Sequence, residues 1–322
     1  MIGIEFKSPL APYIQGLLDQ KRSLGFKYDV EEYVLGRFDK YWSETNGGSE
    51  DVTMESLSGW CRQLPTEGKP SQAMRISVVR QLALYMNGLG RISYIPTDRI
   101  HYTRPVAHVL SPGEISDLFR VIDGFRPKRQ SPRVTRMADG YRVIFRLILS
   151  TGLRRGEAVG LRLSDINWEN RSLAIRDAKG HKDRVVFMAE DLADTMKKYI
   201  RENLLLMETE WVFPSFDPAR HFSGGALAAR FKTFWNQTAY APGCPDPPTI
   251  HSLRHTYVVM RMNTWMSNGI DLCVMLPYLS RALGHKSANE TFYYYHQVRE
   301  SFRIIQEKDS LSQTIFPEVR TR

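Results

Sequence analysis

The stretch STGLRRGEAVGLRLSDI, residues 150–166, predicts a short helix that begins after Gly152 and carries two arginines in its first turn. Its apolar residues recur at helical spacing, at Ala158, Leu161 and Leu163. Arginine at this end opposes the helix dipole, which favours anions at the N-terminus. A bound phosphate resolves the conflict, because Arg154 and Arg155 can converge on its oxygens together with free backbone N–H groups. The alternative is a surface ion pair with Glu157.

A second segment, HSLRHTYVV at residues 251–259, also has the apolar pattern of a helix. His251 therefore shares a face with Arg254 and with His255. Two histidines four residues apart suit a zinc pair, but position 252 is serine where a zinc protease has glutamate, and no third ligand is obvious. Two histidines that line a core helix are the stronger alternative, and we expect no metal here.

Residues 172–188, SLAIRDAKGHKDRVVFM, contain two short apolar runs separated by a cationic turn. The alternating apolar positions are Leu173 and Ile175, then Val185 and Phe187. This pattern predicts a β-hairpin whose turn carries Lys179 and Lys182.

The stretch LGHKSANETFYYYHQV, residues 283–298, combines a Gly-His pair with three consecutive tyrosines. Ser287 and Glu290 have the spacing of a capping box, which predicts that a helix starts just after the Gly-His pair. Consecutive helical positions point about 100° apart, so at most one of the three tyrosines serves a given site. A tyrosine in such a place is more often a packed aromatic than a nucleophile.

Outside these segments the sequence predicts two domains. Apolar residues in residues 9–89 recur at helical spacing and indicate roughly four helices. Residues 95–112 contain three prolines and no sustained period, which is typical of an extended linker. With the boundary near Arg104, the domains are residues 1–104 and residues 105–322.

A capped helix start and a basic segment follow the linker. Ser111, Pro112 and Glu114 occupy the N-cap, first and third positions of a predicted helix. Residues 126–136 contain five Arg or Lys and no acid, with two prolines that prevent a regular helix. A solvated loop is the commoner interpretation, whereas beside a nucleic-acid site such a loop neutralises backbone phosphates. The candidate phosphate contacts are Arg126, Lys128, Arg129, Arg133 and Arg136, together with Lys182.

Composition sets wider limits on the protein. The 322 residues are 42% hydrophobic, which indicates a folded chain, and 44 Lys and Arg against 35 acids give a net charge of +9. That charge favours a polyanionic partner without proving one. Three distant cysteines make a disulfide framework improbable and fit a reducing cytoplasm. No uninterrupted run of about 18 apolar residues occurs, so we expect a soluble protein that is not exported.

Taken together, the four chemical segments resemble the tyrosine recombinase, or phage integrase, family. That family shows an arginine after T-G-L, a lysine in a β-turn, an H-x-L-R-H segment, and L-G-H followed nine residues after its histidine by tyrosine and then x-His. The matching residues here are Arg154 after Thr151–Leu153, Lys179, residues 251–255, Leu283–His285, and Tyr294 with His296.

The resemblance implies a role for each matching residue. Arg154 and Arg254 hold the non-bridging oxygens of a DNA phosphodiester, and Tyr294 is the nucleophile that forms a 3′-phosphotyrosyl link. Lys179 protonates the leaving 5′ oxygen, with Lys182 as the second choice. The remaining roles are proton transfer at the tyrosine for His251, a hydrogen bond to the phosphate for His285, and orientation of the first arginine for Glu157.

The resemblance also implies a mainly α fold with a small antiparallel β-sheet, in which a helical core-binding domain precedes a mixed α/β catalytic domain with a C-terminal tail. The expected partners are double-stranded DNA at attachment or recombination sites and further copies of the chain in a tetrameric synapse. The tail docks on a neighbouring protomer or folds back on its own domain. An accessory or partner recombinase is possible, and the host is a phage, transposon, plasmid or chromosome-resolution system. We expect neither ATP, metal nor a membrane to take part.

Three other functions fit the sequence less well. A DNA-binding protein of the same fold that does not cut would lack one of the reacting residues, and all are present. A type IB topoisomerase shares the chemistry but relaxes DNA without pairing sites, and the size and motifs match the bacterial recombinases better. A metal-dependent nuclease needs clustered carboxylates, and the sequence shows no convincing cluster.

Overall fold

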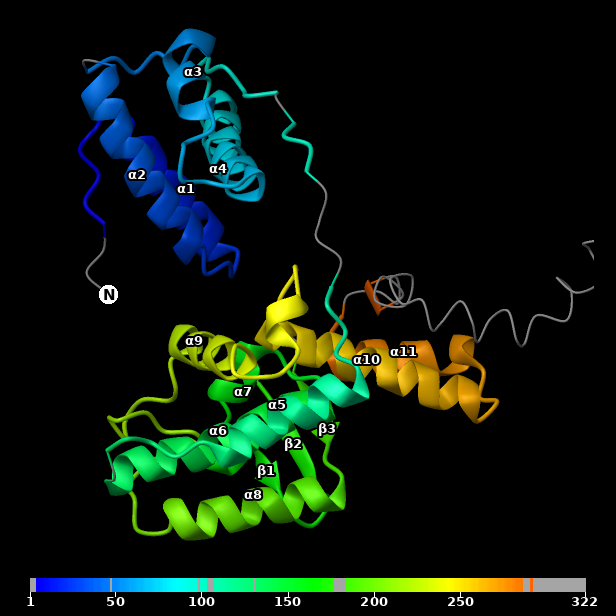
Figure 1. Ribbon diagram of the computed structural model, residues 1–322. Coiled ribbons are helices and arrows are strands. Elements are labelled where there is room, and N and C mark those ends of the chain that lie inside the picture. The colour runs from blue at the N-terminus through cyan, green and yellow to red at the C-terminus, as the bar shows by residue number, and fades with distance from the viewer. Residues whose placement is uncertain are drawn as a thin grey trace, which may run out of the picture. The chain divides into compact units, whose positions relative to one another are not determined.

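A computed structural model of the chain separates two units, Met1–Pro105 and Val106–Arg322 (Figure 1). Lys179, Lys182, Tyr294 and His296 lie outside the part of the chain that it describes. The described residues are 4–46, 48–97, 99–102, 107–129, 131–176, 183–285 and 290–291. Within them the fold is mainly helical with a small antiparallel sheet, as the sequence predicts.

The described part of the first unit contains the four helices that the apolar periodicity predicts. They are α1 (Ala11–Ser23), α2 (Asp29–Thr45), α3 (Met54–Cys61) and α4 (Lys69–Gly88). Leu35, Phe38 and Trp42 of α2 are completely buried and form the centre of the core. Tyr33 of the same helix is 61% exposed.

The second unit is organised around one long central helix, α6 (Pro132–Thr151), which packs against helices on several sides. Its described neighbours are α5 (Pro112–Gly124), α7 (Arg155–Val159), α8 (Glu190–Asn203) and α10 (Ile250–Ser267). Two further helices complete the unit in the described residues: α9 (Gly224–Trp235) packs on α5 and α7, and α11 (Leu272–Leu283) packs on α10 (Figure 1). Short 3-10 turns occur at Leu163–Asp165 and Ala241–Gly243. The start of α5 is confirmed, since the Ser111 hydroxyl accepts from the N–H of Glu114 and the Glu114 carboxylate accepts from that of Ser111.

Two helix boundaries differ from the expectation. Pro132 does not prevent a helix but occupies the first position of α6, with the Ser131 hydroxyl accepting from the N–H of Val134. Proline suits that position because its missing N–H would have no partner within the helix. The helix after Gly152 is shorter than predicted: α7 ends at Val159, and Arg154 is its N-cap rather than part of its first turn.

The described sheet has three antiparallel strands in the order β1 (Ile166–Asn167), β2 (Ser172–Ile175) and β3 (Arg184–Phe187). The hairpin prediction is confirmed, but the assigned faces of β3 were wrong. Leu173 pairs with Val186 and Ile175 pairs with Arg184, so Arg184 and Val186 point inward. Consequently the two apolar residues that were expected inside, Val185 and Phe187, are 54% and 69% exposed.

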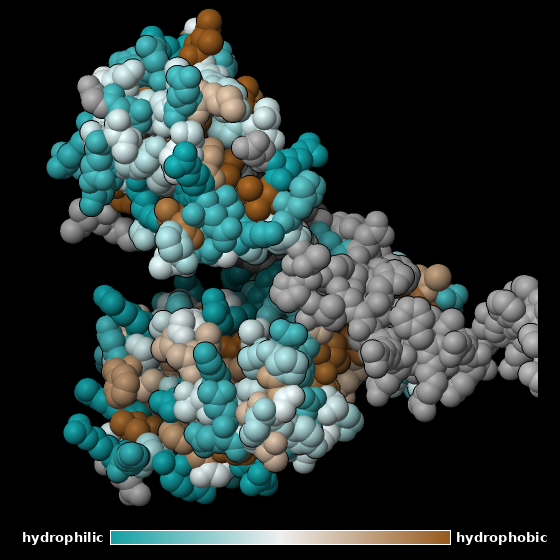
Figure 2. All heavy atoms as spheres, turned by 45° about the horizontal axis from the view of Figure 1, so that its top comes forward, coloured by the Kyte–Doolittle hydropathy of each residue, from teal (hydrophilic) through white to brown (hydrophobic). Residues whose placement is uncertain are grey.

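Hydrophilic side chains cover most of the face that Figure 2 shows, and hydrophobic ones appear there as small separate groups. Among the described residues, no helix combines the length and the apolar character that a membrane span requires. The three cysteines are free thiols, of which Cys273 is exposed.

Candidate active site

The centre of the site is the C-terminal end of α11. The N–H of His285 bonds to the carbonyl of Ser280 at 2.9 Å, and the N–H of Gly284 bonds to that of Arg281 at 3.0 Å. This is the paired ending that helices adopt when the next residue is left-handed, and Gly284 has φ +66°. The carbonyls of residues 282–284 then have no N–H partner from the helix itself, because the helix ends there.

Three arginines from three different elements donate to these three carbonyls. Arg154 precedes α7, Arg184 begins β3, and Arg254 lies in α10. The hydrogen bonds are Arg184 Nε to Ala282 O at 2.7 Å, Arg254 Nη2 to Leu283 O at 2.8 Å, and Arg154 Nη2 to Gly284 O at 3.0 Å. A helix C-terminus carries partial negative charge, so cations are favoured there. The helix end therefore assembles the cluster of positive charges.

Arg254 is the most deeply buried of the three, with 1% of its surface exposed. Its Nη1 donates to the carbonyl of Gly152 at 2.6 Å, and Gly152 ends α6 with φ +69°. The guanidinium thus joins the ends of α6 and α11. A buried charge needs such partners, because an uncompensated one costs several kcal/mol.

Glu157 is the carboxylate that accompanies the arginines. It accepts from the backbone N–H of Arg154 at 2.8 Å and from Arg154 Nη1 at 3.0 Å, and Arg184 binds both of its oxygens at 3.0 and 2.6 Å. Burial alone would raise the pKa of Glu157, but the hydrogen bonds and charges of Arg184 and Arg154 hold it below its usual value. The ion pair with Glu157 therefore forms, with Arg154 rather than with the exposed Arg155.

His285 lies directly beside Arg254, whose Nη2 is 2.9 Å from His285 Nε2. A guanidinium only donates hydrogen bonds, so Nε2 must be the accepting nitrogen and Nδ1 carries the proton. Nδ1 then donates to the hydroxyl of Thr291 at 2.7 Å, and this hydroxyl is 2.7 Å from that of Ser280 in α11. Thr291 is completely buried, which fixes the orientation of the ring.

The histidines of the site are neutral at physiological pH. Burial and nearby arginines lower the pKa of His285 to about 3 and that of His251 to about 4. His251 keeps an exposed edge, and its ring meets that of His255 edge-on at 4.4 Å between centroids. Burial, followed by the charges of neighbouring histidines and Arg254, lowers the pKa of His255 to about 3. A neutral imidazole can accept a proton, which a protonated one cannot.

The predicted site residues thus fall into two groups. The structure brings together Arg154, Glu157, Arg254 and His285, with His251 close enough that the charges of Arg154 and Arg254 lower its pKa. Lys179 and Tyr294 fall outside the described residues. Within the described part of the chain, no group of three or more His, Cys, Asp or Glu side chains could hold a metal ion.

The basic segment lies at the other end of α6 from these residues. Arg126, Lys128, Arg129 and Arg133 are exposed there, as a phosphate contact requires. Arg136 is 5% exposed, and its Nη2 donates to the carbonyl of Ser215 at 2.6 Å. Arg136 therefore lies on the inner face of α6 rather than in a loop, and its buried guanidinium does not offer a phosphate contact, contrary to the sequence-based expectation.

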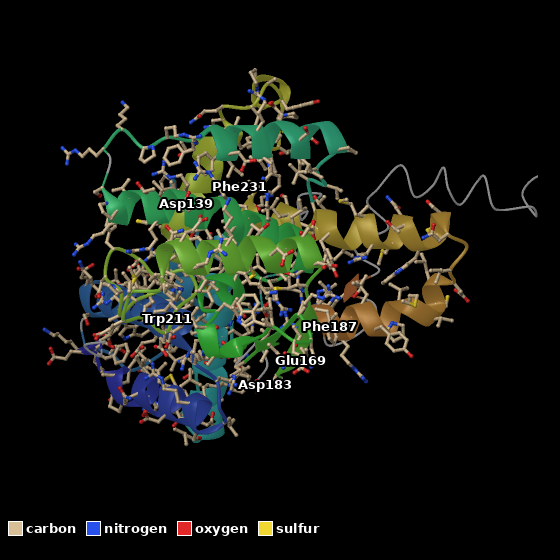
Figure 3. All side chains as sticks on the ribbon, turned by 90° about the horizontal axis from the view of Figure 1, so that it is seen from below. Asp139, Glu169, Asp183, Phe187, Trp211 and Phe231 are labelled. Atoms are coloured by element: carbon tan, nitrogen blue, oxygen red, sulfur yellow. The ribbon has the colours of Figure 1, made fainter. Side chains whose placement is uncertain are left out.

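Sequence reasoning missed Arg184 altogether. The alternation of side chains along the strand could have indicated it, because an arginine two residues before a buried valine lies on the same face of the strand as that valine. Figure 3 labels Asp183, which directly precedes β3, and Phe187, which is the last residue of this strand. The side chain of Arg184 is 6% exposed and that of Glu157 is 8% exposed.

Comparison with solved structures identifies the fold of this arrangement. The Tn1549 transposon integrase in complex with a circular intermediate DNA superposes with a TM-score of 0.64 at 17% identity, covering 92% of this chain and 98% of that one. A lambda integrase dimer bound to a COC′ core site gives a TM-score of 0.63 at 17% identity over 88% and 76% of the two chains. The second unit has the fold of a tyrosine recombinase catalytic domain.

Sequence comparison identifies the family. The phage integrase family model matches residues 128–301. A putative integrase/recombinase of Sinorhizobium fredii, y4rE, is 31% identical over 299 residues, which cover 88% of this chain and 91% of the relative. The tyrosine recombinase XerD of Brucella abortus is 25% identical over 71% and 72% of the two chains. The chain belongs to the phage integrase family.

Gly284 offers a test of how tightly the arginines pack around the end of α11. A Cβ at this position would lie 3.1 Å from Arg184 Nη1 and 3.3 Å from Arg154 Nη1. We expect Gly284→Ala to lower the free energy of unfolding by about 2 to 3 kcal/mol, because the strain of a left-handed alanine adds to the displacement of two guanidinium groups.

The matched control is Gly269→Ala, which has a similarly strained backbone at φ +72°, but whose Cβ would meet no atom within 4 Å in the described part of the chain apart from its sequence neighbours. Backbone strain alone should lower the free energy of unfolding of Gly269→Ala by about 1 kcal/mol. Urea denaturation measures the free energy of unfolding of both variants. Equal decreases would mean that Arg154 and Arg184 move aside without an energetic penalty.

The histidines predict a specific dependence of stability on pH. Their folded pKa values lie below the unfolded value of about 6.5, so the native state binds fewer protons than the unfolded chain as the pH falls below 6.5. The unfolding free energy should therefore decline from pH 7 to pH 5. In NMR spectra of the folded protein, His251 and His285 should not titrate between pH 8 and 5.5, whereas in urea they should titrate near 6.5. Titration midpoints near 6.5 in the folded protein would contradict the lowered pKa values.

Proposed function

We propose that the protein is a site-specific DNA recombinase that cleaves and rejoins strands through a 3′-phosphotyrosyl intermediate, without ATP or metal. The observation that carries this proposal is the convergence of Arg154, Arg184 and Arg254 on one helix end with a single carboxylate, Glu157. These four side chains have a net charge of +2. Such a site suits a phosphodiester, whose negative charge increases as it becomes five-coordinate.

The proposed chemistry begins at the phenol of Tyr294. Its oxygen attacks phosphorus while the bond to the 5′ oxygen breaks, so the phosphate moves from the 5′ oxygen to the tyrosine. Arg154 and Arg254 hold the non-bridging oxygens, a role that suits a planar guanidinium better than a lysine. The phosphotyrosyl ester conserves the energy of the broken bond, and a second 5′ hydroxyl reverses the step to join a new strand.

Two proton transfers accompany this exchange. His251 is suited to accept the phenol proton, because it is neutral and its ring edge is exposed. Lys179 donates a proton to the departing 5′ oxygen, and strands β2 and β3 set the base of the turn that carries it. His285 presents an accepting Nε2 in the structure, so contact with a phosphate oxygen requires it to exchange its tautomer or gain a proton.

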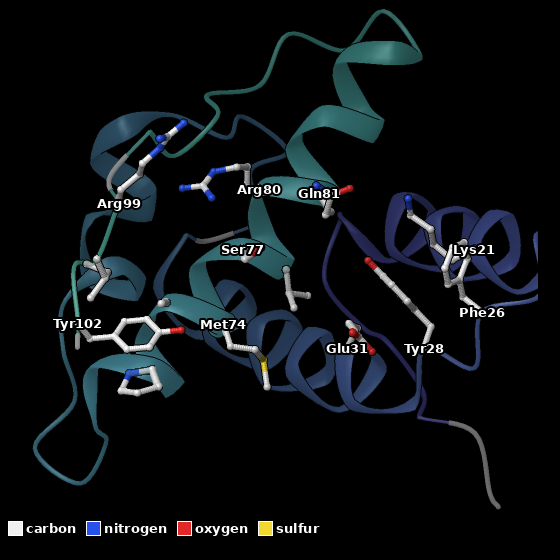
Figure 4. Close-up of a pocket in the computed structure, with 14 residues that line it drawn as sticks. Lys21, Phe26, Tyr28, Glu31, Met74, Ser77, Arg80, Gln81, Arg99 and Tyr102 are labelled. Atoms are coloured by element: carbon white, nitrogen blue, oxygen red, sulfur yellow. The ribbon is translucent and has the colours of Figure 1, made fainter. Parts of the chain in front are cut away.

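The first unit supplies a second DNA contact in this proposal, as a core-binding domain. A hollow of about 720 Å³ on its surface is lined by Lys21, Arg80 and Arg99 against one acid, Glu31 (Figure 4). Tyr28 and Tyr102 also line it, and positive groups mixed with aromatic rings suit a nucleic-acid backbone. We further propose that the chain acts as an oligomer on DNA, by analogy with the lambda integrase dimer on its core site.

Covalent trapping tests the proposed nucleophile. The purified protein, incubated with a nicked suicide substrate made from the DNA that flanks its gene, should form an adduct that resists denaturing electrophoresis. Tyr294→Phe should abolish the adduct, because it removes the attacking oxygen. Tyr293→Phe and Tyr295→Phe are the matched controls and should retain it.

EDTA should leave the yield of adduct unchanged. A strict metal requirement, or an adduct that survives Tyr294→Phe, is the outcome that rejects this mechanism.

The exposed basic segment predicts a change in salt dependence. Each phosphate contact contributes about 0.9 to the slope of log K against log salt. Replacing Lys128, Arg129 and Arg133 together by glutamine should therefore reduce the slope by about 2 to 3, measured by fluorescence anisotropy with a duplex.

The control removes the same amount of charge from α8, where Lys197, Lys198 and Arg201 are also exposed. Those three replacements should leave the slope nearly unchanged. Equal reductions in both triple variants would show that overall charge, not this segment, determines DNA binding.

A further inference from the structure

Arg184 lies at the base of the hairpin and reaches the centre of the site. It is the first residue of β3, paired with Ile175 at the end of β2, and its side chain points inward. Its three bonds connect three elements: both oxygens of Glu157 in α7 accept from its Nη atoms, and the carbonyl of Ala282 in α11 accepts from its Nε.

The geometry of the carboxylate shows why Arg184 matters to Arg154. Both arginines bind Glu157, but Arg184 does so with two parallel hydrogen bonds and is 6% exposed, whereas Arg154 shares one guanidinium bond and is 24% exposed. A two-pronged guanidinium–carboxylate pair is the stronger arrangement. Arg184 is thus the inner counter-ion of Glu157, and Arg154 is the outer one nearer to solvent.

Removing Arg184 would change the charge that an incoming phosphate meets. Glu157 would then have Arg154 as its remaining ion-pair partner among these side chains, and a buried carboxylate would draw the outer guanidinium toward itself. The pair of Arg154 and Glu157 would be neutral overall. A phosphodiester would lose most of the attraction of Arg154 and would also meet the repulsion of the carboxylate.

We propose that Arg184 is a positioning residue that neutralises Glu157, so that the charge of Arg154 remains available to the scissile phosphate. This inference rests on the proposed function. Arg184 does not touch the reacting atoms; it acts through Glu157 and Arg154. Its bond to Ala282 also holds β3 against the end of α11. The carbonyl of Gly284, two residues further on, accepts from Arg154, and His285 follows it.

The test is the single-turnover rate of adduct formation on the suicide substrate. Arg184→Met should lower the rate about 100-fold, comparable to the loss of one preorganised donor to the transition state. Adding Glu157→Gln to Arg184→Met should raise the rate at least tenfold above that of Arg184→Met alone. The second change removes the charge that captures Arg154, while the glutamine amide oxygen still accepts from the Arg154 N–H. Arg162→Met, which breaks the exposed ion pair with Glu210, is the control and should keep the wild-type rate.

The double variant distinguishes charge neutralisation from simple support of the fold. A residue that only braced the hairpin would give no recovery when Glu157 is also changed, so a double variant as slow as Arg184→Met overturns the inference. If Arg184→Met does not fold, the double variant serves as the test by itself, because it contains neither buried charge. A rate within tenfold of the wild-type rate supports the inference, and a 100-fold loss of rate overturns it. Absence of any adduct in the wild type would instead reject the proposed function.

Discussion

The C-terminus of α11 is the feature on which the site depends. Three guanidinium groups repel one another, and they stay close only where something negative holds each of them. The carbonyls of residues 282–284 do so, one for each arginine, and Glu157 adds a formal negative charge beside two of them. Gly284 makes this possible, because its left-handed backbone ends the helix there and the lack of a side chain leaves space for two guanidinium groups.

Contacts within the protein itself hold these arginines in place. Arg254 is already fixed by the ends of α6 and α11, and Arg154 by α7 and α11, so the binding of a phosphate does not have to order them. Preorganised charge is the form of electrostatic catalysis that needs least rearrangement during the reaction. Burial is the main cause of the low pKa of His285, and the positive cluster that attracts a phosphate lowers that pKa further.

Sequence reasoning found the residues whose spacing reflects local chemistry and missed those that depend on tertiary contacts. Arg154, Arg254 and His285 stand in short motifs, and all three meet at one helix end. Arg184 was missed, because Val185 and Phe187 suggested the opposite face of β3, and the pairing with β2 shows that Arg184 and Val186 are the inward residues. Arg136 illustrates the converse, since a run of basic residues cannot show which member turns inward when a helix starts within it.

The buried hydroxyl of Thr291 limits where the proposed nucleophile can act. Thr291 is held against α11 by Ser280 and His285, and Tyr294 follows it by three residues. Three residues of fully extended chain span about 10 to 11 Å at most. The backbone of the proposed nucleophile can therefore lie no further than this from a residue whose hydroxyl contacts His285.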